Sequence, residues 1–237
     1  MITLVQFPKS PKRLSFSPFC LKLESYFKIA NVPYENKFAI SMPDSKKKKM
    51  PMIIDDGELI EDSTFIIEHL KQKHGIDLDQ HLSLEQKAIA KAFQRLCELS
   101  IVDIVVYFRW VDPKNWPKFR DVVFKGAPWF IKSTVANFIA GSIKKNLHKH
   151  GIGRFTDAER LKILDDNLSA ISNYLGENKF FFGDQVSSID TVLYSHLVQV
   201  SSRGVVPQFE HAMEKYPNLK RYIANFSRLY WPEHENN

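Results

Sequence analysis

Cysteine is scarce in this sequence of 237 residues. It occurs only as Cys20 and Cys97, which lie far apart along the chain. Two isolated cysteines cannot form the disulfide framework on which small secreted domains depend. We therefore expect a reducing compartment, with the cytoplasm as the default location.

Targeting and membrane-spanning segments are also missing. The apolar run Ile2–Phe7 is followed at once by cations, which is the reverse of the charge order in a secretory signal. The most apolar later stretch, residues 122–143, contains two lysines and a proline, so it indicates a buried or surface-lying helix. No membrane span is expected.

Neither the charges nor the histidines predict a nucleic-acid or metal partner. A net charge of +6 mildly favours anionic ligands, but no basic stripe is interleaved with aromatic residues. Nucleic-acid binding is therefore not expected. His148 and His150 have no matching cysteine or carboxylate pattern, so no metal is assigned. The run Lys46–Lys49 repels itself and is interpreted as a solvated loop.

The composition is that of a globular protein, with 44% hydrophobic and 25% charged residues. The length suffices for two modest domains. Strand and helix signals alternate up to residue 76, and after a linker at 77–82 only helix signals remain. We predict an α/β, thioredoxin-like domain over residues 1–76 and an all-helical domain over residues 83–237.

The first domain has the element order β-α-β-β-β-α. The turn Asp55-Asp56-Gly57 predicts a hairpin between the last two strands. This order is that of a thioredoxin-like half. The predicted strands are Ile2–Phe7, Tyr34–Phe38, Met50–Ile54 and Glu58–Glu61, and the predicted helices run from Pro18 to about Ala30 and from Ser63 to before Gly75.

Capping signals mark the helix starts of the second domain. The segments Ser83–Gln86 and Thr156–Glu159 have the spacing of capping boxes, and Ser187–Asp190 is a weaker variant. Tyr216–Leu219 begins the last predicted helix.

The segment Ser17-Pro18-Phe19-Cys20 begins the first helix. Ser17 is a good N-cap, and Pro18 suits the first helical position. A helix N-terminus concentrates N–H donors and partial positive charge, which favours an anion such as a thiolate. The pattern resembles the Cys-Pro-x-Cys site of glutaredoxins, with Ser17 in place of the nucleophilic cysteine. A serine forms no disulfide, but it can donate a hydrogen bond to the sulfur of a ligand, which suggests glutathione binding.

Four motifs, in order along nearly the whole chain, are similar to those of the cytosolic glutathione transferase superfamily. They are Met50-Pro51-Met52-Ile53, Asp62-Ser63, Phe182-Gly183-Asp184 with Ser187–Asp190, and Tyr216–Leu219. Other segments resemble the Failed axon connections group, which is related to metaxins: Ser17–Glu24, Asp62–Ile67, Tyr107–Trp110 and Gly151–Arg154.

The resemblance implies a glutathione site. Asp62 would meet the ammonium of the γ-glutamyl end, and Ser63 its carboxylate. The backbone of Met50, before a cis Pro51, would pair with the cysteinyl part. Ser17 would be the hydroxyl that activates the thiol. The alternative is structural: both serines cap helices, and Pro51 makes a turn specific to the fold.

Three functions remain open. The first is a transferase that delivers glutathione, as a co-substrate activated near Ser17, to a hydrophobic electrophile. The second is a binding or scaffold protein without chemistry. The third is redox chemistry at Cys20, which needs an exposed thiol of low pKa, whereas a buried Cys20 would be a small apolar group. The resemblance also implies a homodimer.

Some side chains have weaker candidate roles. One lysine of the Lys46–Lys49 run, or Arg13, could reach the glycyl carboxylate of glutathione. Tyr107, Arg109 and Trp110 could line a pocket for the second substrate, although aromatic residues on a long helix more often belong to the core. Cys97 is expected in the core.

Overall fold

The structure, a computed structural model, describes residues 1–9, 14–39, 45–201 and 205–232. Contacts between Cα atoms divide the chain into two compact units. The predicted domain limits, residues 76 and 83, stay a prediction, because the two units join segments that are distant in sequence. Unit 1 comprises Met1–Gln94, Glu177–Leu197 and Arg221–Asn237, and unit 2 comprises Arg95–Gly176 and Val198–Lys220.

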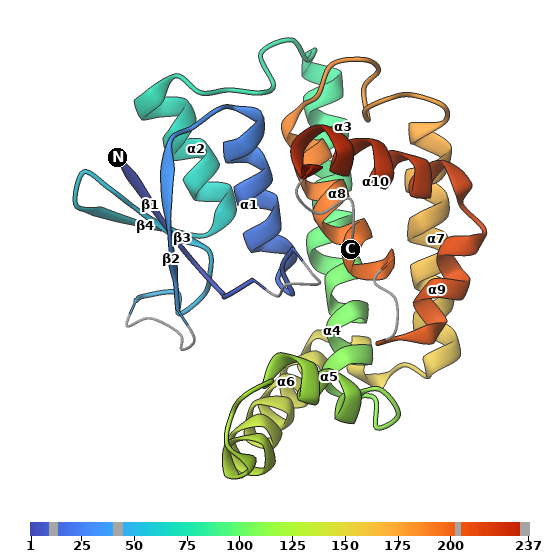
Figure 1. The fold of residues 1–237 in the computed structure, drawn as a ribbon. Helices are drawn as coiled ribbons and strands as arrows, with labels where there is room; N and C mark the ends of the chain where they lie inside the picture. The colour runs from blue at the N-terminus through green and yellow to red at the C-terminus, as the bar shows by residue number, and fades with distance from the viewer. Residues whose placement is uncertain (10–13, 40–44, 202–204, 233–237) are drawn as a thin grey trace. The chain divides into compact units, whose positions relative to one another are not determined.

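A four-stranded sheet forms the centre of the N-terminal region, in the order β2-β1-β3-β4 (Figure 1). Strand β1 is parallel to β2 and antiparallel to β3, and β3 is antiparallel to β4. Asp56 and Gly57, in the turn after β3, have φ angles of 51° and 83°. Two successive positive φ angles are typical of a type I′ hairpin turn. All four predicted strands are present: β1 (Ile2–Gln6), β2 (Tyr34–Phe38), β3 (Met52–Asp55) and β4 (Glu58–Glu61).

Helices α1 (Pro18–Ile29) and α2 (Ser63–His74) share one hydrophobic core with the sheet. The core contains Leu4 of β1, Tyr26 of α1, Ile53 of β3 and Ile66 of α2, and all four residues are fully buried. Helix α2 ends before Gly75, whose φ of 66° gives the left-handed cap that glycine adopts without a steric cost. The predicted β-α-β-β-β-α order is therefore confirmed.

In the described residues after β4, the regular elements are helices, as predicted, apart from an isolated bridge between Phe180 and Gly183. The α-helices are α3 (Leu84–Arg95), α4 (Val102–Trp110), α5 (Trp116–Val123), α6 (Ala136–His150), α7 (Asp157–Leu175), α8 (Ser188–Ser201), α9 (Pro207–Glu214) and α10 (Pro217–Tyr230). Two π-helical segments, Leu96–Ile101 and Ile131–Val135, and a 3₁₀ turn, Ile152–Arg154, lie between them.

The predicted capping boxes form hydrogen bonds. Gln86 N donates to Ser83 Oγ over 3.1 Å, and Ser83 N donates to Gln86 Oε1 over 2.9 Å. Thr156 and Glu159 make the same reciprocal pair at the start of α7. Ser187 donates to Asp190 through both its N–H and its hydroxyl. Burial raises the pKa of the Asp190 carboxyl above its ordinary value, although these hydrogen bonds oppose the shift.

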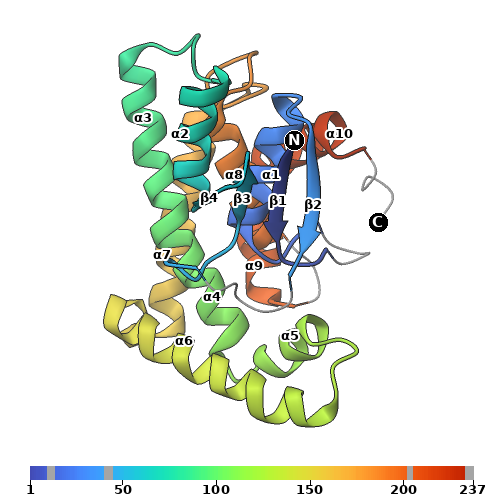
Figure 2. The ribbon, with the colours of Figure 1, turned by 90° about the vertical axis from the view of Figure 1, so that its left-hand side faces the viewer.

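The apolar stretch 122–143 does not form the single helix that its composition suggested. Helix α5 ends at Val123, and the next helical segment begins at Ile131; Figure 2 shows α5 and α6 as separate helices. Gly126 has a φ of 83°, and Pro128 disfavours helical backbone in the residue before it. Within the described ranges, no helix combines the length and apolar character needed to cross a membrane.

Candidate glutathione site

Ser17 caps α1, as predicted. Its Oγ accepts a hydrogen bond from Cys20 N over 3.3 Å, and Ser17 N donates to Ser15 Oγ over 3.1 Å. Pro18 occupies the first helical position, where a missing N–H costs nothing. Because the Ser17 oxygen accepts the capping bond, its O–H remains able to donate. Its role in activating a thiol stays a prediction.

Cys20 is 0% exposed. Burial raises the pKa of its thiol to about 11, and a hydrogen bond with Ser17 offsets only part of that shift. At pH 7 such a thiol is ionised to about one part in 10⁴. These properties are the opposite of those that a redox cysteine needs. Burial likewise raises the pKa of Cys97, which is also fully buried.

The start of α2 has an unusual backbone. Asp62 has a φ of 78°, which is uncommon outside glycine, although aspartate is among the residues that tolerate it. Its Oδ1 accepts from Thr64 N over 2.9 Å, and its carbonyl accepts from Ile66 N. The chain thereby turns from β4 directly into the helix. Ser63, 3% exposed, is the first residue of α2, where the helix dipole favours an anion.

The sheet brings two of the predicted site segments to one end. Met52 lies opposite Glu61, so the segments that precede β3 and follow β4 meet at that end of the hairpin. These segments contain Met50–Pro51, whose peptide bond is cis as expected, and Asp62–Ser63. Val5 of β1 also pairs with Met52.

Lys22 is a neighbour of Ser63 that the sequence did not indicate. Its ammonium donates to Ser63 Oγ over 3.2 Å and lies 3.5 Å from Thr64 Oγ1. Lys22 is only 1% exposed. Since an ammonium can only donate, Ser63 Oγ accepts from it, and the serine O–H is left to donate to another group. Nearly all of α1 up to Phe27 is buried, so the helix has no exposed polar face from which the role of Lys22 could be predicted.

A pocket of unit 1 adjoins this helix start. Its walls include Lys22 and Thr64, but not Ser17, Met50 or Ser63. Cationic side chains outnumber carboxylates in its lining, which favours an anionic group. The lining cations are Lys22, Lys71, Lys87 and Lys91, and the carboxylates are Glu68 and Asp79.

The remaining candidate residues have partners within the fold or lie outside the described residues. Lys47 Nζ donates to the carbonyl of Glu61 over 3.1 Å, so this lysine is tied to the end of β4. Arg13 lies outside the described residues. Arg109 is 3% exposed and donates to Gln199 Oε1 over 2.8 Å. The proposed contribution of Tyr107, Arg109 and Trp110 to a second-substrate pocket stays a prediction.

Comparison with known proteins identifies the family. Residues 18–115 match the family model of the glutathione S-transferase N-terminal domain, and residues 164–226 match that of the C-terminal domain. The chain is 30% identical over 220 residues to the isoprene-epoxide glutathione S-transferase of Rhodococcus sp., covering 90% of this chain and 92% of that protein. The chain belongs to the glutathione S-transferase superfamily.

Within that superfamily the chain lies near the metaxin-like branch. It is 31% identical over 246 residues to Failed axon connections of Drosophila melanogaster, covering 98% of this chain. It is 27% identical over 189 residues to metaxin-1 of Mus musculus, covering 75% of this chain. The chain spans only 59% and 58% of the lengths of these two relatives.

A solved structure shows the same fold. It is a glutathione S-transferase of Methylobacterium radiotolerans in complex with glutathione sulfonate, with a TM-score of 0.63 and 17% sequence identity. The match covers 99% of this chain and 93% of that one. The thioredoxin-like region followed by a helical region is therefore the glutathione S-transferase fold, as expected.

Proposed function

We propose that this chain binds glutathione at the sheet end where Met50–Pro51 and Asp62–Ser63 meet, and transfers it to a hydrophobic electrophile. The observation that carries the proposal is the donor set at the start of α2. A buried serine lies at a helix N-terminus, and its hydroxyl accepts from the ammonium of Lys22 over 3.2 Å. Such a set suits a carboxylate.

The γ-glutamyl end of glutathione carries both charges that this set can bind. Its carboxylate would accept from the hydroxyl and N–H of Ser63, with Lys22 behind the hydroxyl as a counter-charge. Its ammonium would donate to Asp62, since a carboxylate that accepts one bond from Thr64 N keeps acceptor capacity. The backbone of Met50 would pair with the cysteinyl part.

Ser17 would stabilise the glutathione thiolate. Lowering a thiol pKa by two units requires about 2.7 kcal/mol. A charge-assisted hydrogen bond contributes about 1.5–3 kcal/mol, and a helix N-terminus about 0.3–1 kcal/mol more, so the two suffice together. The thiol proton passes to water. The sulfur then forms a bond to an electrophilic carbon, and the displaced electron pair leaves on the leaving group or epoxide oxygen, which takes a proton from water.

The relatives support both the transferase and the choice of electrophile. One of them is an isoprene-epoxide glutathione S-transferase, so a small epoxide is the first electrophile to test. We propose a cytoplasmic location, because two cysteines far apart in the sequence form no disulfide framework. We also propose a homodimer, as the family resemblance implies.

The test begins with a calorimetric titration of the chain with reduced glutathione. We expect binding that Ser63→Ala weakens and Ser83→Ala leaves unchanged. Ser83→Ala is the matched control, because it removes the N-cap of α3 at an exposed residue that does not line the pocket beside the start of α2. Ser17→Ala should lower the rate of epoxide conjugation and leave binding intact. No binding of glutathione to the wild-type chain would refute the proposed transferase.

A scaffold without chemistry is the second candidate function. It is favoured by the similarity to Failed axon connections and metaxin-1, two relatives found in addition to the transferase. This function predicts that the folded chain shows no heat of glutathione binding and no conjugation activity. Redox chemistry at Cys20, the third function left open by the sequence, has no observation in its favour, because the thiol is buried and its pKa is raised. Cys20→Ser would abolish such chemistry and spare conjugation.

A further inference from the structure

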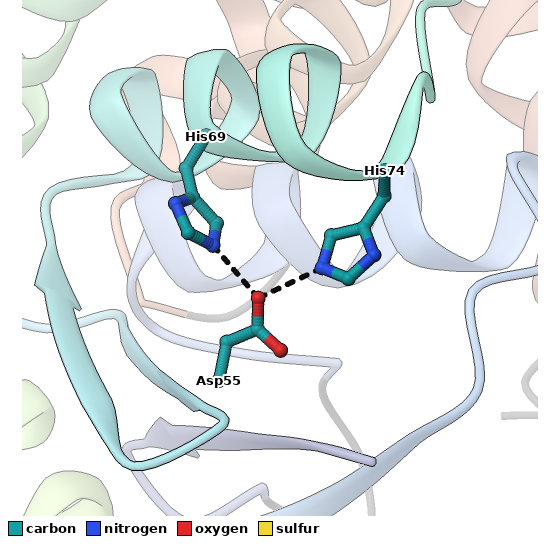
Figure 3. A group of neighbouring side chains, drawn as sticks. All are labelled: Asp55, His69 and His74. Carbon is teal, nitrogen blue, oxygen red and sulfur yellow. Dashed lines mark hydrogen bonds and ion pairs between the residues drawn. The ribbon is translucent and has the colours of Figure 1, made fainter.

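Three potential metal ligands converge on one point outside the candidate glutathione site. Asp55 ends β3, and His69 and His74 lie on the second half of α2 (Figure 3). Each histidine Nε2 lies 2.7 Å from the same oxygen, Oδ2 of Asp55. The ligand atoms all lie within 4.8 Å of one another.

The local fold explains why these side chains meet. Residues five positions apart on a helix point about 140° away from each other, so His69 and His74 reach around the helix from two sides. The β3–β4 hairpin packs against α2, and Asp55 lies between the two rings (Figure 3). The Asp55 side chain is 2% exposed, while those of His69 and His74 are 16% and 31% exposed. The cluster is thus anchored on a buried carboxylate and open to solvent at the rings.

We propose that Asp55, His69 and His74 form a Zn²⁺ site with three protein ligands and a water molecule in the fourth position. Two imidazole nitrogens and one carboxylate form a ligand set that zinc binds in proteins. Imidazole nitrogen also favours zinc over magnesium and calcium, which prefer oxygen ligands.

The two Nε2···Oδ2 distances are shorter than the distances between ligand atoms of a tetrahedral site. With metal–ligand bonds of about 2.0–2.2 Å, neighbouring ligand atoms lie about 3.3 Å apart. Each Nε2···Oδ2 distance of 2.7 Å would therefore open by about 0.6 Å. Rotation of the partly exposed rings supplies this change. Zn²⁺ then takes the place of the Nε2 protons, and each neutral imidazole carries its proton on Nδ1.

Lys73 is the competitor of the metal. Its ammonium lies 3.1 Å from Asp55 Oδ2, where a cation opposes Zn²⁺. Lys73 also lies 2.7 Å from Asp56 Oδ2, so it has a second acceptor to hold it when the metal enters. The site therefore predicts an unusual result: removal of Lys73, which is not a ligand, strengthens Zn²⁺ binding.

Bound zinc would tie the end of α2 to the β3–β4 hairpin. His74 is eleven residues from Ser63 at the start of the helix, a distance of about 16 Å along the axis. The metal would thus stabilise the helix that carries the glutathione donors without touching them. The zinc proposal stands whether or not the chain binds glutathione.

The test is a titration of the tag-free full chain with Zn²⁺ alone against a chromophoric zinc indicator. Cys20 and Cys97 are buried, so they do not offer thiolates in the folded chain. We expect one Zn²⁺ per chain, and at least about tenfold weaker binding in His69→Asn/His74→Asn. His81→Asn, which changes an exposed histidine outside the cluster, is the matched control and should bind like the wild type.

Two further measurements keep the test decisive. Co²⁺ should give the visible absorption of a tetrahedral site in the wild type and not in the double variant. Lys73→Gln, which leaves all three ligands in place, should lower the dissociation constant for Zn²⁺. The proposal is overturned by absence of binding, by equal binding in the double variant, by equal loss in His81→Asn, or by unchanged or weaker binding in Lys73→Gln.

Discussion

Replacing Lys22 with methionine should weaken glutathione binding, because it removes a buried positive charge from behind Ser63. Methionine has a similar length and no charge, so the packing of α1 is largely kept. The ammonium lies 3.2 Å from Ser63 Oγ. A ligand carboxylate that accepts from the same hydroxyl lies about 2.7 Å beyond it, which brings the two charges within about 5 Å.

The size of the effect follows from that distance. At an effective dielectric constant of about 20 the attraction is about 3 kcal/mol, and in bulk water it is about 1 kcal/mol. Lys22 is buried, while a ligand would remain partly in contact with water. We therefore expect a loss of about 1–3 kcal/mol, which raises the Kd for glutathione by about 5- to 150-fold.

Calorimetric titration of wild type, Lys22→Met and Lys91→Met provides the measurement. Lys91 lines the same pocket but is exposed on α3, and its ammonium contacts Gln94 rather than Ser63, so Lys91→Met is the matched control. Wild-type affinity in Lys22→Met, or an equal loss in Lys91→Met, would refute the role of Lys22. Failure of the wild type itself to bind would instead refute the proposed function.

Three further predictions concern other residues. Ser17→Ala should lower kcat/KM for conjugation by about 10- to 150-fold, the equivalent of a charge-assisted hydrogen bond, and an unchanged rate would show that Ser17 only caps α1. Cys20, with a pKa raised to about 11, should react with iodoacetamide about tenfold faster per pH unit between pH 7 and 10. Its reaction should become rapid only after the chain unfolds. Mass spectrometry measures the labelling, and fast labelling of the folded chain at pH 7 would contradict the prediction. Thr156→Ala should destabilise the fold by about 0.5–2 kcal/mol in urea unfolding, because α7 loses its capping box, and an unchanged midpoint would show that the box contributes nothing.

Local signals predicted much of the fold. The capping boxes at Ser83 and Thr156, the hairpin turn at Asp56 and the N-cap at Ser17 depend on residues a few positions apart, so the sequence contains all of their partners. The apolar stretch 122–143 was interpreted wrongly as one helix. The prediction relied on the apolar composition and gave too little weight to the backbone preferences of Gly126 and Pro128, which decide where the helices end.

The amino-acid pattern was enough to predict the order of strands and helices, the positions of most helix starts and the family motifs at Met50–Pro51 and Asp62–Ser63. The contact between Lys22 and Ser63, 41 positions apart, and the place of Asp55 between two histidines of α2 became visible in the folded chain alone. The physical reason is that periodicity identifies a face of a helix but not the element packed against it. Burial, charge pairing and the pKa of a thiol depend on that packing.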